Sequence, residues 1–123
     1  MKVSVWIGNS PSWDVLDEYL TFHFNEDGEA IPCRFAELFQ IDWFDEDYRE
    51  ASVSEERTIN GDNLLQEHSQ GKAISDQLGK LCTMATPCNA VVLLFDFNYS
   101  GLVKSADLGM AQLEFIGTAD ISL

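Results

Sequence analysis

Basic side chains are scarce in this 123-residue sequence. It has 7 Lys and Arg against 21 Asp and Glu, which gives a formal net charge of −14 at pH 7. A chain this acidic has no basic patch with which to hold a nucleic-acid backbone or an anionic membrane surface. We expect its partners to be cations or basic surfaces, unless the charge serves only to keep the protein from aggregating.

Cysteine pairs and long apolar runs are also missing. The three cysteines, Cys33, Cys82 and Cys88, are odd in number and form no C-x-x-C pair, which argues against a disulfide framework or a zinc knuckle and indicates a reducing compartment. The first residues contain no apolar segment typical of a secretory signal, and the longest apolar run, residues 90–95, is too short to span a membrane. We therefore expect a cytoplasmic protein.

A recognisable catalytic constellation is absent as well. The two histidines, His23 and His68, have no Ser or Cys beside them in a nucleophile motif, and His68 lies in a polar segment where we expect it to be exposed. All eight glycines are isolated, so there is no glycine-rich phosphate loop. We predict a protein that is not an enzyme and that has no catalytic residue, no cofactor and no structural metal.

Apolar patterning predicts several strands and one domain. A single domain, residues 1–123, is expected, because two domains of about 60 residues each would be marginally stable. Residues 2–8 alternate like a strand, and the continuous apolar run 90–95 is typical of a central strand that is covered on both faces. Further strands are expected at residues 48–53 and 113–121, and residues 57–59 extend the former or form another strand. The expected sheet core is Val3, Val5, Ile7, Val91, Leu93 and Phe95.

Three helices are expected between these strands. The first begins at Ser10-Pro11, where a serine cap precedes a proline at the first helical position. The second opens at Ile31-Pro32, and the third covers residues 73–82. Asn60-Gly61-Asp62 reads as a turn. The whole pattern predicts an α+β fold with a four- to five-stranded mixed sheet and about three packed helices.

Acidic residues gather in the first half of the chain. Residues 14–56 hold 14 of the acids against only Arg34 and Arg49, and the densest part interleaves acids with aromatic residues. Such a patch can bind a protein, because aromatic anchors supply contact area and carboxylates meet basic side chains. The predicted binding residues are Asp42, Trp43, Asp45, Glu46, Asp47 and Tyr48, joined by Glu26 and Asp27. Trp43 fits either the core or the interface. A calcium or magnesium site and a solvated acidic loop are the alternatives.

Four segments form a characteristic combination. They are V-S-V-W-I-G-N at residues 3–9, residues 35–39 followed by I-D-W-F-D-E-D-Y at 41–48, N-A-V-V-L-L-F-D-F-N-Y at 89–99, and L-E-F-I-G at 113–117. In this order they resemble the immunity protein 22 family of bacterial polymorphic toxin systems. The middle of the chain, about residues 52–86, matches the family poorly. The resemblance implies a small non-enzymatic α+β protein that binds and neutralises a cognate toxin encoded beside it.

The acidic character of the chain suits a basic toxin as the partner. An expected cytoplasmic location implies a toxin that acts there, such as a nuclease, and nucleases are commonly basic because they bind phosphates. Two other functions stay open from the residues alone. One is a carboxylate-based divalent-cation binder or small hydrolase, and the other is an acidic adaptor or regulatory protein.

Overall fold

The two segments with the strongest strand pattern lie side by side in a five-stranded sheet. The computed structural model describes residues 1–79 and 86–122, and every structural statement below concerns these residues. The strands are β1 (Lys2–Asn9), β4 (Arg49–Thr58), β5 (Cys88–Phe95), β6 (Ser105–Asp107) and β7 (Gln112–Asp120). Their order is β4-β5-β1-β7-β6, and every pair of neighbours is antiparallel. The long strand β4 is thus one edge of the sheet.

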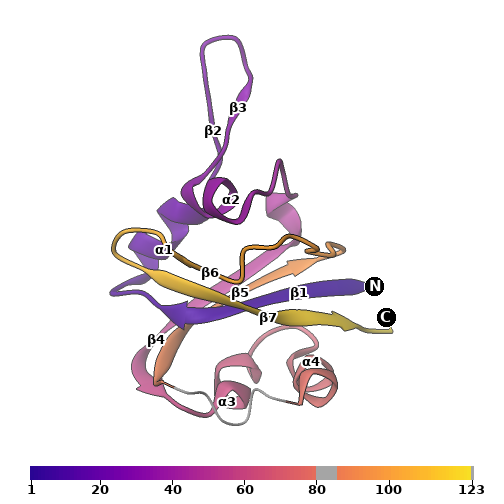
Figure 1. The fold of residues 1–123 in the computed structure, drawn as a ribbon. Coiled ribbons are helices and arrows are strands. Elements are labelled where there is room, and N and C mark those ends of the chain that lie inside the picture. Colours follow the sequence, from indigo (N-terminus) through magenta and orange to yellow (C-terminus); the bar gives the residue numbers. More distant parts are fainter. Residues whose placement is uncertain (80–85, 123) are drawn as a thin grey trace.

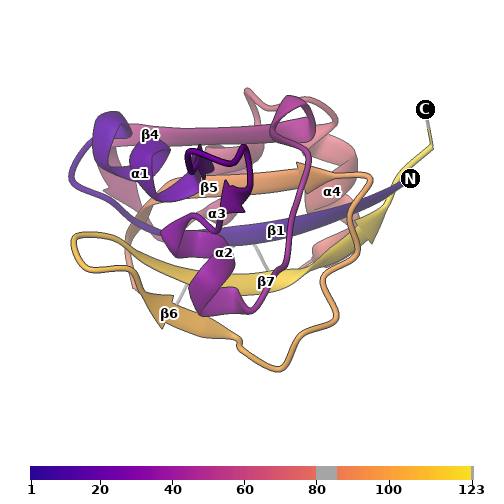
Figure 2. The ribbon, with the colours of Figure 1, turned by 90° about the horizontal axis from the view of Figure 1, so that it is seen from above.

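Helices cover both faces of this sheet, as Figures 1 and 2 show. Helices α1 (Trp13–Leu20) and α2 (Arg34–Phe39) pack on one face, and α3 (Gly61–Leu65) and α4 (Gly71–Leu78) pack on the other. The first layer is aromatic: the ring centroid of Trp6 lies 4.9 Å from that of Phe35 and 5.3 Å from that of Tyr99. The second layer is aliphatic and is built on the opposite side of β1 and β5.

A small hairpin stands away from the body between α1 and α2 (Figure 1). Its strands are β2 (His23–Phe24) and β3 (Ala30–Ile31), and the turn between them is closed by Asn25, whose Oδ1 accepts the backbone N–H groups of Asp27 and Glu29. Gly28 has φ of +79°, a conformation that glycine adopts without steric cost. After α2, a single 3₁₀ turn, η1 (Glu46–Tyr48), leads directly into β4.

The predicted α+β fold is confirmed, and so is the expected core. Val3, Val5, Ile7, Val91 and Leu93 are all buried, while Phe95 is partly buried at the strand end. The expectation of a mixed sheet is wrong, because all strand pairs are antiparallel. The physical reason is that both neighbours of β1 run against it, and that within residues 1–79 and 86–122 no helix links two adjacent parallel strands as a βαβ unit would.

Two helix starts differ from the prediction. Helix α1 is capped by Ser12, whose Oγ accepts the N–H of Val15, and not by Ser10, which is buried at the end of β1. Helix α2 begins at Arg34, because Ile31 pairs with His23 in the hairpin and is not part of the helix.

Three further segments differ from the sequence reading. The expected turn at residues 60–62 opens α3, with Asn60 Oδ1 accepting the N–H of Asp62. The helix expected over residues 73–82 is α4, which ends at Leu78, and Leu81 and Cys82 lie outside the described residues. Strand β6 was not predicted.

Candidate functional site

The acidic, aromatic stretch predicted as a binding patch is a loop fixed from within by Phe44. This side chain is buried and its ring centroid lies 4.9 Å from that of Phe22 and 5.9 Å from that of Phe35. With Phe44 inside, its neighbours face outward: 59% of Trp43 and 53% of Tyr48 is exposed. Trp43 is therefore a surface residue and does not belong to the core.

The carboxylates of this loop fall into two groups. Asp45 Oδ1 accepts the N–H of Asp47 at 2.9 Å and so caps η1, and Glu46 Oε1 accepts the N–H of Phe22 at 3.2 Å. These two hold the loop in place. The carboxylates of Asp42 and Asp47 form no hydrogen bond or ion pair with any residue that the structure describes, and both are exposed. They are thus available to a partner.

Surface hollows flank the two exposed aromatic side chains. One of about 220 Å³ lies between Trp43 and Tyr48. A second, of about 300 Å³, is bounded by Tyr48 and Asp47, and a third, of about 340 Å³, by Trp43 and Asp42. Trp43 and Tyr48 therefore protrude between concave regions. A surface of this shape is expected where the side chains of a partner pack around aromatic anchors.

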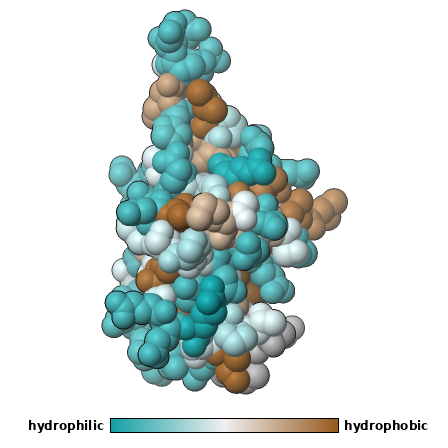
Figure 3. Space-filling view, turned by 90° about the vertical axis from the view of Figure 1, so that its left-hand side faces the viewer, coloured by the Kyte–Doolittle hydropathy of each residue, from teal (hydrophilic) through white to brown (hydrophobic). Residues whose placement is uncertain are grey.

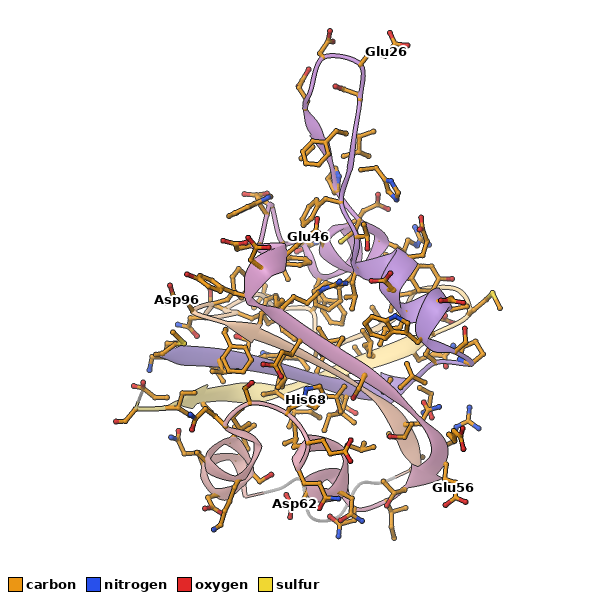
Figure 4. All side chains as sticks on the ribbon, turned by 180° about the vertical axis from the view of Figure 1, so that it is seen from behind. Glu26, Glu46, Glu56, Asp62, His68 and Asp96 are labelled. Atoms are coloured by element: carbon orange, nitrogen blue, oxygen red, sulfur yellow. The ribbon has the colours of Figure 1, made fainter. Side chains whose placement is uncertain are left out.

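The tip of the hairpin carries the other predicted residues, Glu26 and Asp27. Figure 4 shows Glu26 at the far end of the hairpin and Glu46 near the body. Glu46 of the loop therefore contacts the chain at the base of the hairpin, through the backbone N–H of Phe22, and not at its tip. Below its acidic tip the hairpin exposes apolar surface, visible in Figure 3, to which Phe24 (65% exposed) and Ile31 (48% exposed) contribute.

His68 occupies a site that the sequence reading did not foresee. Its side chain is only 9% exposed, so the expectation of an exposed histidine is wrong. His68 Nε2 lies 2.8 Å from Ser52 Oγ, and Nδ1 lies 3.1 Å from Glu50 Oε1, which is the order of groups in a Ser–His–acid relay. Residues 50 and 52 share one face of β4, but no sequence spacing links them to residue 68. No local motif could have revealed the arrangement.

The relay ties the connection between α3 and α4 to strand β4. Because an ionised carboxylate only accepts hydrogen bonds, His68 Nδ1 donates to Glu50, which also accepts the N–H of Ser69 at 3.1 Å. Burial raises the pKa of Glu50, but the hydrogen bonds from Ser69 and His68 outweigh it and the net pKa is lowered. The neighbouring hollow is lined by Glu50 and Ser69 but not by Ser52, so the hydroxyl does not face a substrate-sized space there.

Within residues 1–79 and 86–122 no three His, Cys, Asp or Glu side chains are grouped so as to hold a metal ion. No helix there has the length and apolar character needed to cross a membrane. The thiols of Cys33 and Cys88 are free and buried, and burial raises the pKa of both.

Comparisons with known proteins give one family. The family model described as Immunity protein 22 matches residues 3–121, including the middle segment for which the sequence alone indicated a poor match. Comparison with curated proteins and with solved structures gives no significant match. Since the family match runs from β1 through the last strand and spans both helical layers, the chain belongs to the Immunity protein 22 family.

Proposed function

We propose that this protein binds a cognate bacterial toxin and neutralises it, and that the loop 42–48 is the centre of the interface. Membership of an immunity-protein family supports the toxin as partner. The observation that carries the assignment of the surface is the exposure of Trp43 and Tyr48 beside the unpaired carboxylates of Asp42 and Asp47. Large aromatic side chains have a high cost when left in water, and aromatic residues are enriched at the energetic centres of interfaces.

The charge of the chain supports a basic toxin, such as a nuclease, as the partner. With a net charge of −14, the protein attracts a positively charged surface over distances of about a Debye length. A nuclease that binds phosphates presents such a surface. Carboxylates placed on it would occupy the positions that phosphates need, so binding and inhibition would be one event.

The hairpin β2–β3 would extend the contact beyond the loop. It stands clear of the body and combines exposed Phe24 and Ile31 with carboxylates at its tip, among them Glu26 and Asp27. We place the encounter in the cytoplasm, because free, buried thiols are typical of a reducing compartment. We assign no reaction to the chain and interpret the Ser52–His68–Glu50 relay as a structural link.

The proposal is tested by removing the two unpaired charges while leaving the structural ones. Asp42→Asn with Asp47→Asn keeps Asp45 and Glu46, which cap η1 and hold Phe22. The double variant should associate with the toxin several-fold more slowly at low salt, and the difference should shrink at high salt because salt screens the attraction. Stopped-flow mixing with the cognate toxin measures the association rate.

The matched control removes two exposed charges elsewhere. Glu55→Gln with Glu56→Gln changes the net charge by the same amount at the other end of β4, distant from the loop (Figure 4). If both double variants slow association equally, only the net charge matters and loop 42–48 is not the interface. If neither slows it, electrostatic attraction has no part in the encounter.

A further inference from the structure

The hollow between Trp43 and Tyr48 has walls from two distant parts of the sequence. One wall comes from the loop before β4, and the other is the end of β5 with the residues after it, Asp96 and Phe97. Its volume of about 220 Å³ is below the roughly 300–1,000 Å³ of pockets that hold small-molecule ligands. It is therefore sized for a single side chain of a partner and not for a metabolite.

The lining of this hollow favours a cation. Five aromatic residues contribute to it, two of them the exposed Trp43 and Tyr48. Two carboxylates, Asp45 and Asp96, belong to it as well, and no Lys, Arg or His is among its lining residues. Aromatic faces attract cations through their quadrupole, and the aliphatic stem of a long basic side chain packs against apolar walls. Carboxylates at the same place would bond the charged end.

The fold does not require the negative charge of Asp96. Asp96 follows directly on β5 and has φ of +56°, a left-handed conformation that Asp and Asn tolerate better than most residues. Asn would satisfy the backbone equally well, so the turn requires no negative charge. The Asp96 carboxylate is exposed and forms no hydrogen bond or ion pair within the described ranges 1–79 and 86–122.

We propose that this hollow binds one arginine or lysine side chain of the toxin, with its stem between Trp43 and Tyr48 and its charged end on Asp96. Asp45 adds a second carboxylate, although one of its oxygens already accepts the N–H of Asp47. The inference rests on the proposed function, because it names the group on the toxin that the loop 42–48 surface receives. Asp96, which lies outside the loop 42–48, thereby becomes part of the proposed binding surface.

The first experiment needs no toxin. The full ¹⁵N-labelled chain is titrated with Nα-acetyl-arginine amide while the indole N–H signal of Trp43, identified with Trp43→Phe, is followed by NMR. The arginine probe should shift this signal, and Nα-acetyl-citrulline amide, which has nearly the same shape without the charge, should not. Equal shifts with both probes would overturn the proposal, because the hollow would then recognise shape and not charge.

Two variants assign the effect to Asp96. Asp96→Asn keeps the left-handed turn and should weaken binding of the arginine probe by about two- to fivefold, the range for loss of one partly exposed ion pair. Glu56→Gln removes the same charge at a place distant from Asp96, as Figure 4 shows, and should leave binding unchanged. If the two variants weaken binding equally, the probe senses only the overall charge and the proposal is wrong.

The second experiment separates this inference from the proposed function. Affinity for the cognate toxin is measured for Asp96→Asn and Glu56→Gln by calorimetry. A loss confined to Asp96→Asn supports the inference. If the toxin binds Asp96→Asn as tightly as the parent, while Asp42→Asn with Asp47→Asn slows association, the hollow is not used and the proposed function stands. If neither set affects the toxin, both proposals fail.

Discussion

Leu93 offers the most direct test of the fold, because its side chain fills the aliphatic layer under α3 and α4. It is fully buried on β5, pairs with Val5 on β1, and belongs to the same cluster as Leu65 and Ile74. Truncation of a buried Leu to Ala costs about 2–5 kcal/mol, through lost burial and the cavity left behind. The helices over this layer are short and can settle partly into the space, so we expect a loss near the middle, about 3 kcal/mol.

Urea denaturation followed by far-UV circular dichroism measures this loss. With a denaturant slope of about 1.5 kcal/mol per molar, Leu93→Ala should lower the midpoint by about 2 M. Leu102→Ala is the matched control, since the same atoms are removed from a side chain that is 91% exposed, and it should change stability by less than about 0.5 kcal/mol. Midpoints that agree between the two variants would show that Leu93 is not in the core.

Two further variants test single features of the structure. Gly8→Ala puts a Cβ against the backbone carbonyl of Gln112, so β1 and β7 must separate and the free energy of unfolding should fall by at least about 3 kcal/mol. In Gly117→Ala the new Cβ meets the flexible Leu78 side chain, so thermal melts should show a clearly smaller loss of stability. Because hydrogen bonds lower the pKa of Glu50, its contribution to stability is present above the ordinary pKa of a glutamate and is lost as pH falls through the lowered value. Glu50→Gln should therefore reduce the loss of stability as the pH falls below the ordinary pKa of a glutamate, about 4.3. If stability falls with pH as steeply in the variant as in the parent, the result would contradict the relay geometry.

The strands at the centre of the sheet could be predicted because burial alone determines them. The run at residues 90–95 is apolar on both faces, and β5 is covered on both faces. Strand β6 is short and partly polar, and it forms because β7 presents a free edge on which Ala106 pairs with Leu113. Helix α1 begins at Trp13, after the Ser12 cap, and not at Ser10. The reason is that Asn89, 79 residues from Ser10 in the sequence, holds both backbone groups of Ser10 in an extended conformation after β1. Such partners are not visible in local sequence patterns.

The candidate site, like the fold, could be predicted only in part from the sequence. The composition of residues 42–48 predicts an aromatic and acidic patch, but it cannot tell which carboxylates are free, since that depends on Phe22 reaching Glu46 and on the tight turn that Asp45 caps. It also cannot include Asp96, which reaches the loop only because β5 is the neighbour of β4. Two of the six residues predicted in the loop, Asp45 and Glu46, therefore hold the fold. The charge that we propose to recognise the partner, Asp96, comes from a segment whose sequence indicates only the end of a core strand. Specificity in this protein is thus expected to change by substitution at the ends of strands, where the sheet supplies the position and leaves the side chain free.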